Sequence, residues 1–180
     1  NASSHSIARK NPSEYGNAEK NDKPEKSSAD GIEISDGILK IKGEPMDIPL
    51  SYTAMVRIFG KERIVFTHRT MQDDNGRTVQ YDRRSFLVWD NAGVTAVRNE
   101  ENAYNISAIY LWVTESKTPA ESIPVPASVF SGDVLVDGVR WDRKSDMAVS
   151  SGKLEIAAPV SGGYMEITFA DSRDRKDTWQ

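Results

Sequence analysis

The sequence predicts a β-dominated α+β domain, in which antiparallel meander sheets carry one short helix, about residues 51–59, on a face. Short runs of alternating apolar and polar residues, about eight to ten of them, have the period of half-buried strands. Turns rich in Gly, Asn and Asp separate these runs at short intervals, as in successive hairpins. A single segment has the helical period of three to four residues. Together these patterns predict a fold made mostly of strands.

The domain is expected to begin with a hairpin. Ile32 and Ile34 alternate with polar residues, which predicts a short strand. Asp36-Gly37 is a turn signal, and residues 38–41 are the expected return strand. Residues 42–45, Lys-Gly-Glu-Pro, are expected to form a loop, because Gly and Pro interrupt regular structure.

The helix is predicted from an apolar repeat that follows this loop. Apolar residues recur at i, i+3, i+4 and i+7 from Tyr52 to Phe59, so they share one helical face. Ser51 is in position to cap the N-terminus, and Gly60 to end the helix with a positive φ angle. A helix this short is marginal in isolation, so we expect it to pack on a sheet.

After the helix the period changes to two, which predicts a meander. The expected strands comprise residues 64–70, 78–89, 94–97, 106–113, 154–156 and 164–169, with a further hairpin over 134–141. Asn75-Gly76 is the favoured pair for a two-residue hairpin loop. Residues 106–113 are apolar on both alternating sets, which predicts a central strand covered on both faces. Residues 99–105 and 115–127 are expected to form loops.

Composition divides the chain into three parts. Residues 1–30 hold too few apolar groups to fold, so we expect a polar tether or disordered leader, with a tag remnant at residues 1–2. Residues 31–170 are expected to form one globular domain, and 171–180 a charged tail. Two interpretations of the leader stay open. One is a tether from a lipid-modified N-terminus, which places the protein in the periplasm or on the outer membrane facing it; the other is the N-terminus of a cytoplasmic protein.

Composition also excludes several classes of function. The chain has 180 residues, 23 Lys and Arg against 27 Asp and Glu, and a formal net charge of -4. A mildly acidic chain without a basic run argues against general nucleic-acid binding. It contains no apolar run of the length, about 18 residues, that a transmembrane helix needs. Because cysteine is absent, disulfides and thiolate metal sites are excluded as well.

Residues that typically carry out catalysis or bind metals form no recognised motif. His5 lies in the leader, His68 lies in a predicted strand, and no Gly-x-Ser-x-Gly nucleophile motif is present. Residues 73–76, Asp-Asp-Asn-Gly, superficially resemble a calcium loop. However, Met71 stands at the first ligand position and Asp82 in place of the bidentate Glu. We therefore predict no catalytic residue, metal site or cofactor, and a protein that is not an enzyme.

Three segments carry a resemblance to known proteins. They are residues 43–61, with the cap, the helix and its final glycine; 86–94, with a Trp-Asp-x-x-Gly turn; and 130–138, Phe-Ser-Gly-Asp-Val-Leu-Val-Asp-Gly. In this order they resemble small bacterial proteins, often lipoproteins, that look like immunity proteins of type VI or related contact-dependent toxin systems. A wider similarity exists to β-lactamase-inhibitor-like envelope lipoproteins. These motifs are structural, so the resemblance identifies no binding residue.

The resemblance implies a non-enzymatic binding protein that neutralises a cognate secreted antibacterial toxin by covering its active site. We expect the contacts on two loops, one with Asp73 and Asp74, the other with Glu100, Glu101 and Tyr104. Acidic side chains suit a basic partner, and aromatic anchors are typical of tight inhibitors. The main alternative is a structural or assembly lipoprotein of the cell envelope, and the third is a carboxylate-dependent glycan or ester hydrolase. Whether the protein is a monomer or a dimer stays open.

Overall fold

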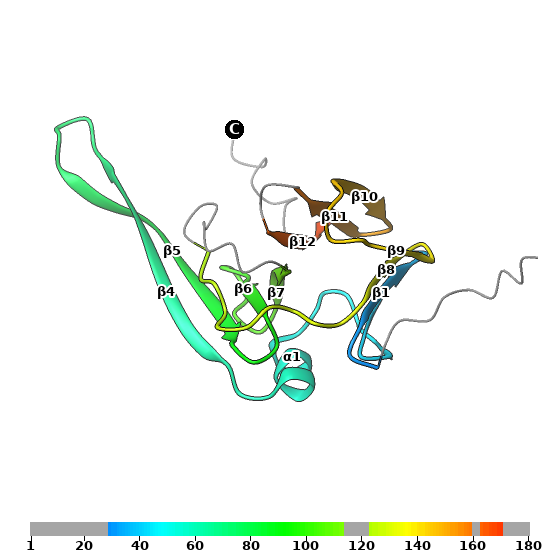
Figure 1. Ribbon diagram of the computed structural model, residues 1–180. Helices are drawn as coiled ribbons and strands as arrows, with labels where there is room; N and C mark the ends of the chain where they lie inside the picture. Colours follow the sequence, from blue (N-terminus) through cyan, green and yellow to red (C-terminus); the bar gives the residue numbers. More distant parts are fainter. Residues whose placement is uncertain (1–28, 114–122, 160–162, 171–180) are drawn as a thin grey trace, which may run out of the picture.

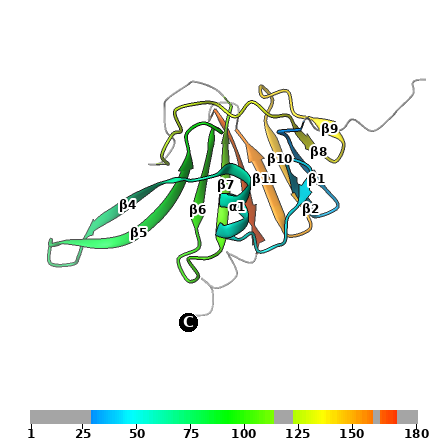
Figure 2. The same cartoon turned by 90° about the horizontal axis from the view of Figure 1, so that it is seen from below.

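The computed structural model describes residues 29–113, 123–159 and 163–170 (Figures 1 and 2). This part of the chain forms two β-sheets and one α-helix. The predicted β-dominated α+β fold with a single helix is therefore confirmed. The predictions for residues 1–28 and 171–180 fall outside the described residues, and the proposed domain boundaries stay predictions.

The larger sheet has seven strands, and all its neighbours are antiparallel. In spatial order they are β10 (Met147–Ser151), β11 (Leu154–Ala158), β12 (Tyr164–Phe169), β7 (Ile106–Trp112), β6 (Val94–Arg98), β5 (Thr78–Trp89) and β4 (Arg63–Gln72). Strands β4 to β7 follow one another as hairpins, as the meander prediction requires. Strands β10 to β12 form a second meander that joins the first where β12 pairs with β7.

The smaller sheet has five strands and includes a parallel pair. Its spatial order is β3 (Glu44–Pro45), β2 (Ile38–Ile41), β1 (Ile32–Ser35), β8 (Val134–Val136) and β9 (Val139–Arg140). The β1–β2 and β8–β9 hairpins confirm the local predictions. The two hairpins join through β1 and β8, which run parallel with Ile32 opposite Val134. Figure 1 shows β1, β8 and β9 together at one side of the molecule. A wholly antiparallel meander is therefore wrong for this sheet.

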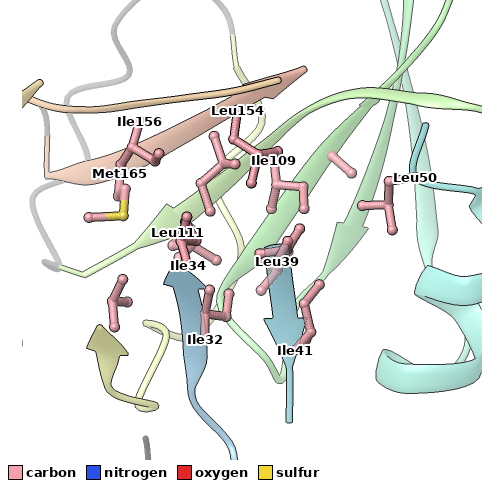
Figure 3. Close-up of a cluster of buried hydrophobic side chains, with 14 of the residues drawn as sticks. Ile32, Ile34, Leu39, Ile41, Leu50, Ile109, Leu111, Leu154, Ile156 and Met165 are labelled. Carbon is pink, nitrogen blue, oxygen red and sulfur yellow. The ribbon is translucent and has the colours of Figure 1, made fainter. Parts of the chain in front are cut away.

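The main core lies between the two sheets. Figure 3 shows aliphatic side chains of β1 and β2 facing those of β7, β11 and β12. The labelled residues are Ile32, Ile34, Leu39, Ile41, Leu50, Ile109, Leu111, Leu154, Ile156 and Met165, and each is almost fully buried. Full burial of one such side chain contributes about 1.5–3 kcal/mol. This contact between sheets supplies most of the framework on which the loops are held.

Helix α1 (Tyr52–Phe59) extends the same core. Met55 is completely buried, and Figures 1 and 2 place the helix against the sheet near β6 and β7. Ser51 caps the N-terminus, because its Oγ accepts a hydrogen bond of 3.1 Å from the Ala54 N–H. Gly60 ends the helix with a φ of 82°, and its N–H donates to the Val56 carbonyl. The predicted helix and both of its ends are confirmed.

The central strand β7 is covered on both faces, as predicted. A second apolar cluster packs on the face of the sheet away from α1 and includes Phe86, Tyr110, Trp112 and Ile123. Thr95 lies beneath it with no exposed surface. Its hydroxyl donates to the Pro124 carbonyl at 2.8 Å and accepts from the Trp112 indole N–H at 3.2 Å. These bonds attach the residues that follow position 122 to the sheet.

Two local predictions were wrong, and one strand was not predicted. Glu44–Pro45 is a short edge strand rather than part of a loop, and Pro is tolerated there because an edge strand does not need every N–H. The turn between β4 and β5 spans five residues, Asp73–Arg77, because the Asp73 N–H closes it on the Arg77 carbonyl. Strand β10 was not expected, since its apolar residues Met147 and Val149 are only half-buried at the sheet edge.

Candidate functional site

A two-stranded arm projects from the large sheet. We call residues 64–85, from β4 and β5, the arm. Strand β6 pairs only with residues 86–89 of β5, so residues 78–85 extend past the last β6 contact. At about 3.3 Å per residue this overhang is about 25 Å long. Figure 1 shows β4 and β5 reaching well beyond the other strands. The arm is thus the part of the sheet that projects beyond its other strands.

The arm concentrates exposed apolar side chains. Within the described residues seven large hydrophobic side chains are exposed, and four of them, Ile64, Phe66, Met71 and Val79, lie on the arm. Met71 and Val79 are direct cross-strand partners, exposed by 48% and 39%. A two-stranded ribbon has little stability of its own in water, and a partner that covers these side chains would add to it.

The tip of the arm is stiffened by Asp73. Its Oδ1 accepts hydrogen bonds from the backbone N–H groups of Asn75 and Arg77, at 2.9 and 2.8 Å. The Gly76 N–H donates to the Asp73 carbonyl at 2.9 Å. Asp74 is exposed beside this turn and forms no such contact within the described residues. The two predicted residues therefore differ: Asp73 holds the turn, while Asp74 presents its carboxylate to solvent.

The second predicted loop connects β6 with β7 at the same end of the sheet. Glu100, Glu101 and Tyr104 are exposed there, and Tyr104 is 76% exposed. Asn99 Oδ1 accepts two backbone hydrogen bonds from the loop, at 2.9 and 3.1 Å. The Tyr52 N–H donates to the Tyr104 carbonyl at 2.7 Å, which joins the loop to the start of α1. Both predicted loops thus face one end of the sheet, but the length of the arm separates them.

A cleft lies at the opposite end of the same sheet. It encloses about 530 Å³ between the end of α1, the start of β4, the β5–β6 turn and residues 130–132. Its apolar wall includes Phe59, Val88, Trp89 and Phe130, and its charged rim comprises Asp30, Lys42, Lys61, Glu62, Arg63 and Asp90. We call this feature the aromatic cleft.

The aromatic wall of the cleft is fixed by its neighbours. The Phe59 and Trp89 ring centroids lie 5.6 Å apart at an interplanar angle of 42°. The Trp89 indole N–H donates to the Gly60 carbonyl at 2.9 Å, which prevents the ring from turning. Lys42 Nζ lies 5.3 Å from the Phe59 centroid, within the range of a cation–π contact. These contacts hold the wall rigid, and of its four apolar side chains only Phe59 has substantial exposed surface, since Val88, Trp89 and Phe130 are at most 3% exposed.

Asp90 ties three segments of the cleft together. Its carboxylate accepts two hydrogen bonds from Arg63, both 2.9 Å, and one from the Ala127 N–H at 3.0 Å. The Asp90 carbonyl also accepts from the Ser128 N–H. The hydrogen bonds from Arg63 lower the pKa of Asp90 against the opposing effect of burial, and Asp90 correspondingly raises the pKa of Arg63. The pair stays ionised and keeps the root of β4 beside the β5–β6 turn.

A tyrosine–carboxylate contact lies near this rim. The Tyr52 hydroxyl donates to Glu62 Oε1 at 2.6 Å, and the Arg98 guanidinium lies 4.7 Å above the Tyr52 ring. The hydrogen bond to Glu62 raises the pKa of Tyr52, with burial as the next cause. Arg98 Nε is buried and has no hydrogen-bond partner in the described part of the chain. One oxygen of Glu62 is thus engaged by Tyr52, although a hydrogen bond from a neutral hydroxyl does not neutralise the carboxylate.

The described residues meet the requirements of neither a metal site nor a membrane-spanning helix. Among them, no three side chains of His, Cys, Asp or Glu are grouped so that they could hold a metal ion. No helix in this part of the structure is long and apolar enough to cross a membrane. His68 lies on β4, but its side chain is outside the described part.

A family model for a domain of unknown function, DUF7738, matches residues 31–151. The chain belongs to this family. No curated protein and no solved structure matches the chain. The DUF7738 match includes the whole arm and every cleft residue except Asp30. It ends with β10, although β12 follows later and pairs with the central strand β7.

The aromatic cleft was missed by reasoning from motifs, although a signal for it was present. The three sequence segments that carried the resemblance each contribute to its wall. Phe59 and Lys61 come from the first, residues 88–92 from the second and 130–132 from the third. Each segment was interpreted as a local structural motif, because nothing in one sequence indicates that turns so far apart meet. In this DUF7738 chain those turns form one concave site.

Proposed function

We propose that this protein is a non-enzymatic binding protein that neutralises a cognate secreted antibacterial toxin, with the arm as its principal contact. The arm carries the proposal: it presents four of the seven exposed large hydrophobic side chains in the described residues, and three of them lie on the part that extends past β6, namely Phe66, Met71 and Val79. The resemblance of the sequence supplies the class of partner. Such immunity proteins cover the active site of the toxin, and a narrow ribbon is suited to enter a catalytic cleft.

The charge of the arm indicates which kind of toxin active site it would complement. Residues 64–85 contain four arginines and three aspartates, a formal charge of +1. Since the whole chain carries -4, the remaining residues carry -5. An active site lined by carboxylates therefore complements the arm better than a basic surface would. The acidic remainder would disfavour other orientations of the same partner.

The stiff tip supports tight binding for an entropic reason. A loop that is ordered only in the complex lowers affinity, because the cost of ordering it is deducted from the contact energy. The hydrogen bonds to Asp73 already order the turn in the free protein. Binding can then use the apolar surface of Met71 and Val79, together with the open edge of β4, to which an extended partner segment could add as a further strand.

The test uses the product of the neighbouring gene as the probe, which the proposal requires to be a toxin. Cells that express this probe should survive when the wild-type chain is co-produced, and the two purified proteins should bind in a calorimetric titration. An arm-shortened variant replaces residues 68–83 by an Asn-Gly turn and keeps the ladder at the root of the arm. We expect this variant to lose both rescue and binding.

Point variants separate a specific contact from general loss of apolar surface. The double variant M71S/V79S removes the exposed cross-strand pair, and we expect it to weaken binding at least about tenfold. The matched control I38S/V139S removes two exposed apolar residues of the small sheet and should bind like the wild type. If the wild-type chain neither binds the probe nor rescues the cells, the proposal is overturned. If the arm-shortened variant rescues the cells fully, the arm is not the contact surface.

A further inference from the structure

The aromatic cleft is not used by the proposed toxin contact, since it lies at the other end of the sheet from the tip of the arm. Its volume of about 530 Å³ falls within the range of sites for small ligands, about 300–1,000 Å³. Such sites combine an apolar wall with a few polar groups that orient the ligand. The cleft has both, and its free polar groups determine which ligand it can recognise.

The carboxylates of the rim are largely engaged. Asp90 is paired with Arg63, and Glu62 accepts the Tyr52 hydroxyl. Asp30 approaches Lys42 only to 4.0 Å, and its side chain is 74% exposed. In water a pair of this kind contributes little. Asp90 is therefore neutralised by Arg63 and Asp30 is largely solvated, whereas Glu62 keeps its charge and has one oxygen bound by the Tyr52 hydroxyl.

The two lysines of the rim are less engaged. Within the described residues, Lys42 Nζ contacts the Ile58 carbonyl at 3.5 Å and the Phe59 ring in addition to Asp30. Lys61 is exposed and forms no hydrogen bond or ion pair within the described residues. Lysines near a helix C-terminus are favoured by the helix dipole, which accounts for part of their placement. It does not account for their position beside the aromatic wall formed by Phe59, Trp89 and Phe130.

From this arrangement we infer that the aromatic cleft binds a small organic carboxylate with a flat apolar body. The body lies against the half-buried Phe59 ring, and the carboxylate lies between the Lys42 and Lys61 ammonium groups. Burial of the apolar body supplies affinity, and the two lysines supply selectivity for an anion. This inference does not depend on the toxin proposal, because it uses no residue of the arm.

Gly132 supports a site that is built rather than incidental. A Cβ at this position would lie 2.7 Å from Phe130 Cζ, and closer still to the Asp30 carbonyl oxygen. Only glycine therefore allows the chain before β1 to pass so close to the wall of the cleft. Together with the Arg63–Asp90 pair, this contact fixes the shape of the cleft from two sides.

The test titrates 3-phenylpropionate into the full chain and follows amide signals by two-dimensional NMR. We expect shifts of the Trp89 indole and Gly132 amide signals and none of Gly76 at the tip of the arm. The uncharged 3-phenylpropionamide, which has the same body, should bind about tenfold more weakly, and so should propionate, which lacks the ring. The arm-shortened variant should bind 3-phenylpropionate like the wild type, whatever the result with the toxin.

Lysine variants give the sharper test, because they leave the wall intact. K42Q and K61Q should each weaken binding of 3-phenylpropionate by about three- to tenfold, and the double variant should lose the preference for acid over amide. K153Q, at a turn of the opposite sheet edge, is the matched control and should leave binding unchanged. Absence of shifts at the cleft overturns the inference. So does equal affinity for the acid and the amide in the wild type, or unchanged affinity in K42Q/K61Q.

Discussion

Removal of the Asp90 carboxylate tests whether this side chain fixes the cleft and the root of the arm. Asp90 accepts two hydrogen bonds from Arg63 and one from the Ala127 N–H. The Arg63 and Asp90 side chains are 50% and 33% exposed. Because solvent screens their attraction, the ion pair contributes about 0.5–1 kcal/mol. The bond from Ala127 to a charged acceptor adds about 1–1.5 kcal/mol. Asp90→Ala should therefore lower the free energy of unfolding by about 2 kcal/mol.

Urea unfolding and thermal unfolding measure this loss. For a domain of this size, about 2 kcal/mol corresponds to a decrease in Tm of about 4–8 °C. Asp90→Asn keeps the shape, and we expect it to lose about half as much, because its amide oxygen can still accept from Ala127. Asp47→Ala is the control, since Asp47 is exposed and has no hydrogen bond or ion pair within the described residues. A double-mutant cycle of Arg63→Met with Asp90→Asn should give a coupling of about 0.5–1 kcal/mol.

The pH dependence of the same variants checks the electrostatic part. The pKa of Asp90 is lower in the folded chain than in the unfolded chain, mainly because Arg63 binds the ionised form. Its stabilisation is thus fully present above the unfolded pKa of an aspartate and is lost as the pH falls through the folded pKa. The stability difference between wild type and Asp90→Asn should be constant near neutral pH and shrink in acid. A coupling near zero at pH 7, or equal stability of the Asp90→Ala and Asp47→Ala variants, would refute the reasoning.

Two further substitutions test close packing and a buried polar bridge. Gly132→Ala should destabilise the fold by more than about 2 kcal/mol, because the new Cβ would overlap the backbone at Asp30. Calorimetry should show a lower Tm, and a Tm equal to that of the wild type would contradict the close approach. Thr95→Val keeps its shape but leaves the Trp112 indole N–H unpaired, so it should cost about 2–3 kcal/mol in urea unfolding. Exposed Thr53→Val should cost far less, and equal losses would argue against the bridge.

Local features of the fold could be predicted because a single segment determines each of them. The cap at Ser51, the end of α1 at Gly60 and the span of β5 all follow from residues within a few positions of one another. The parallel pairing of β1 with β8 does not, since Ile32 and Val134 are about a hundred positions apart and no local period specifies which strands meet. The five-residue turn was missed for a different reason. The Asp73 side chain overrides the preference of Asn75-Gly76 for a two-residue loop.

The candidate sites also divide into features that one segment determines, which could be predicted, and features that the assembled fold determines, which could not. Asp74, Glu100, Glu101 and Tyr104 were predicted on exposed turns and lie there, because loop composition is a local property. Whether they contact a partner stays a prediction. The arm could not be foreseen, since the sequence of β5 does not indicate where β6 stops pairing with it. The cleft depends on three distant turns and on which lysines remain without strong partners, and both are properties of the assembled fold.

The Arg63–Asp90 pair connects the arm with the aromatic cleft, because Arg63 begins β4 while Asp90 follows β5 directly. The pair therefore clamps the two strands at the root of the arm and also forms part of the cleft rim. Variants at the tip, such as M71S/V79S, should then change only toxin binding, and K61Q only carboxylate binding. Loss of Asp90 should weaken both, since it loosens the common root. Loss of one binding activity alone in Asp90→Ala would mean that the two surfaces are held independently, each by its own side of the sheet.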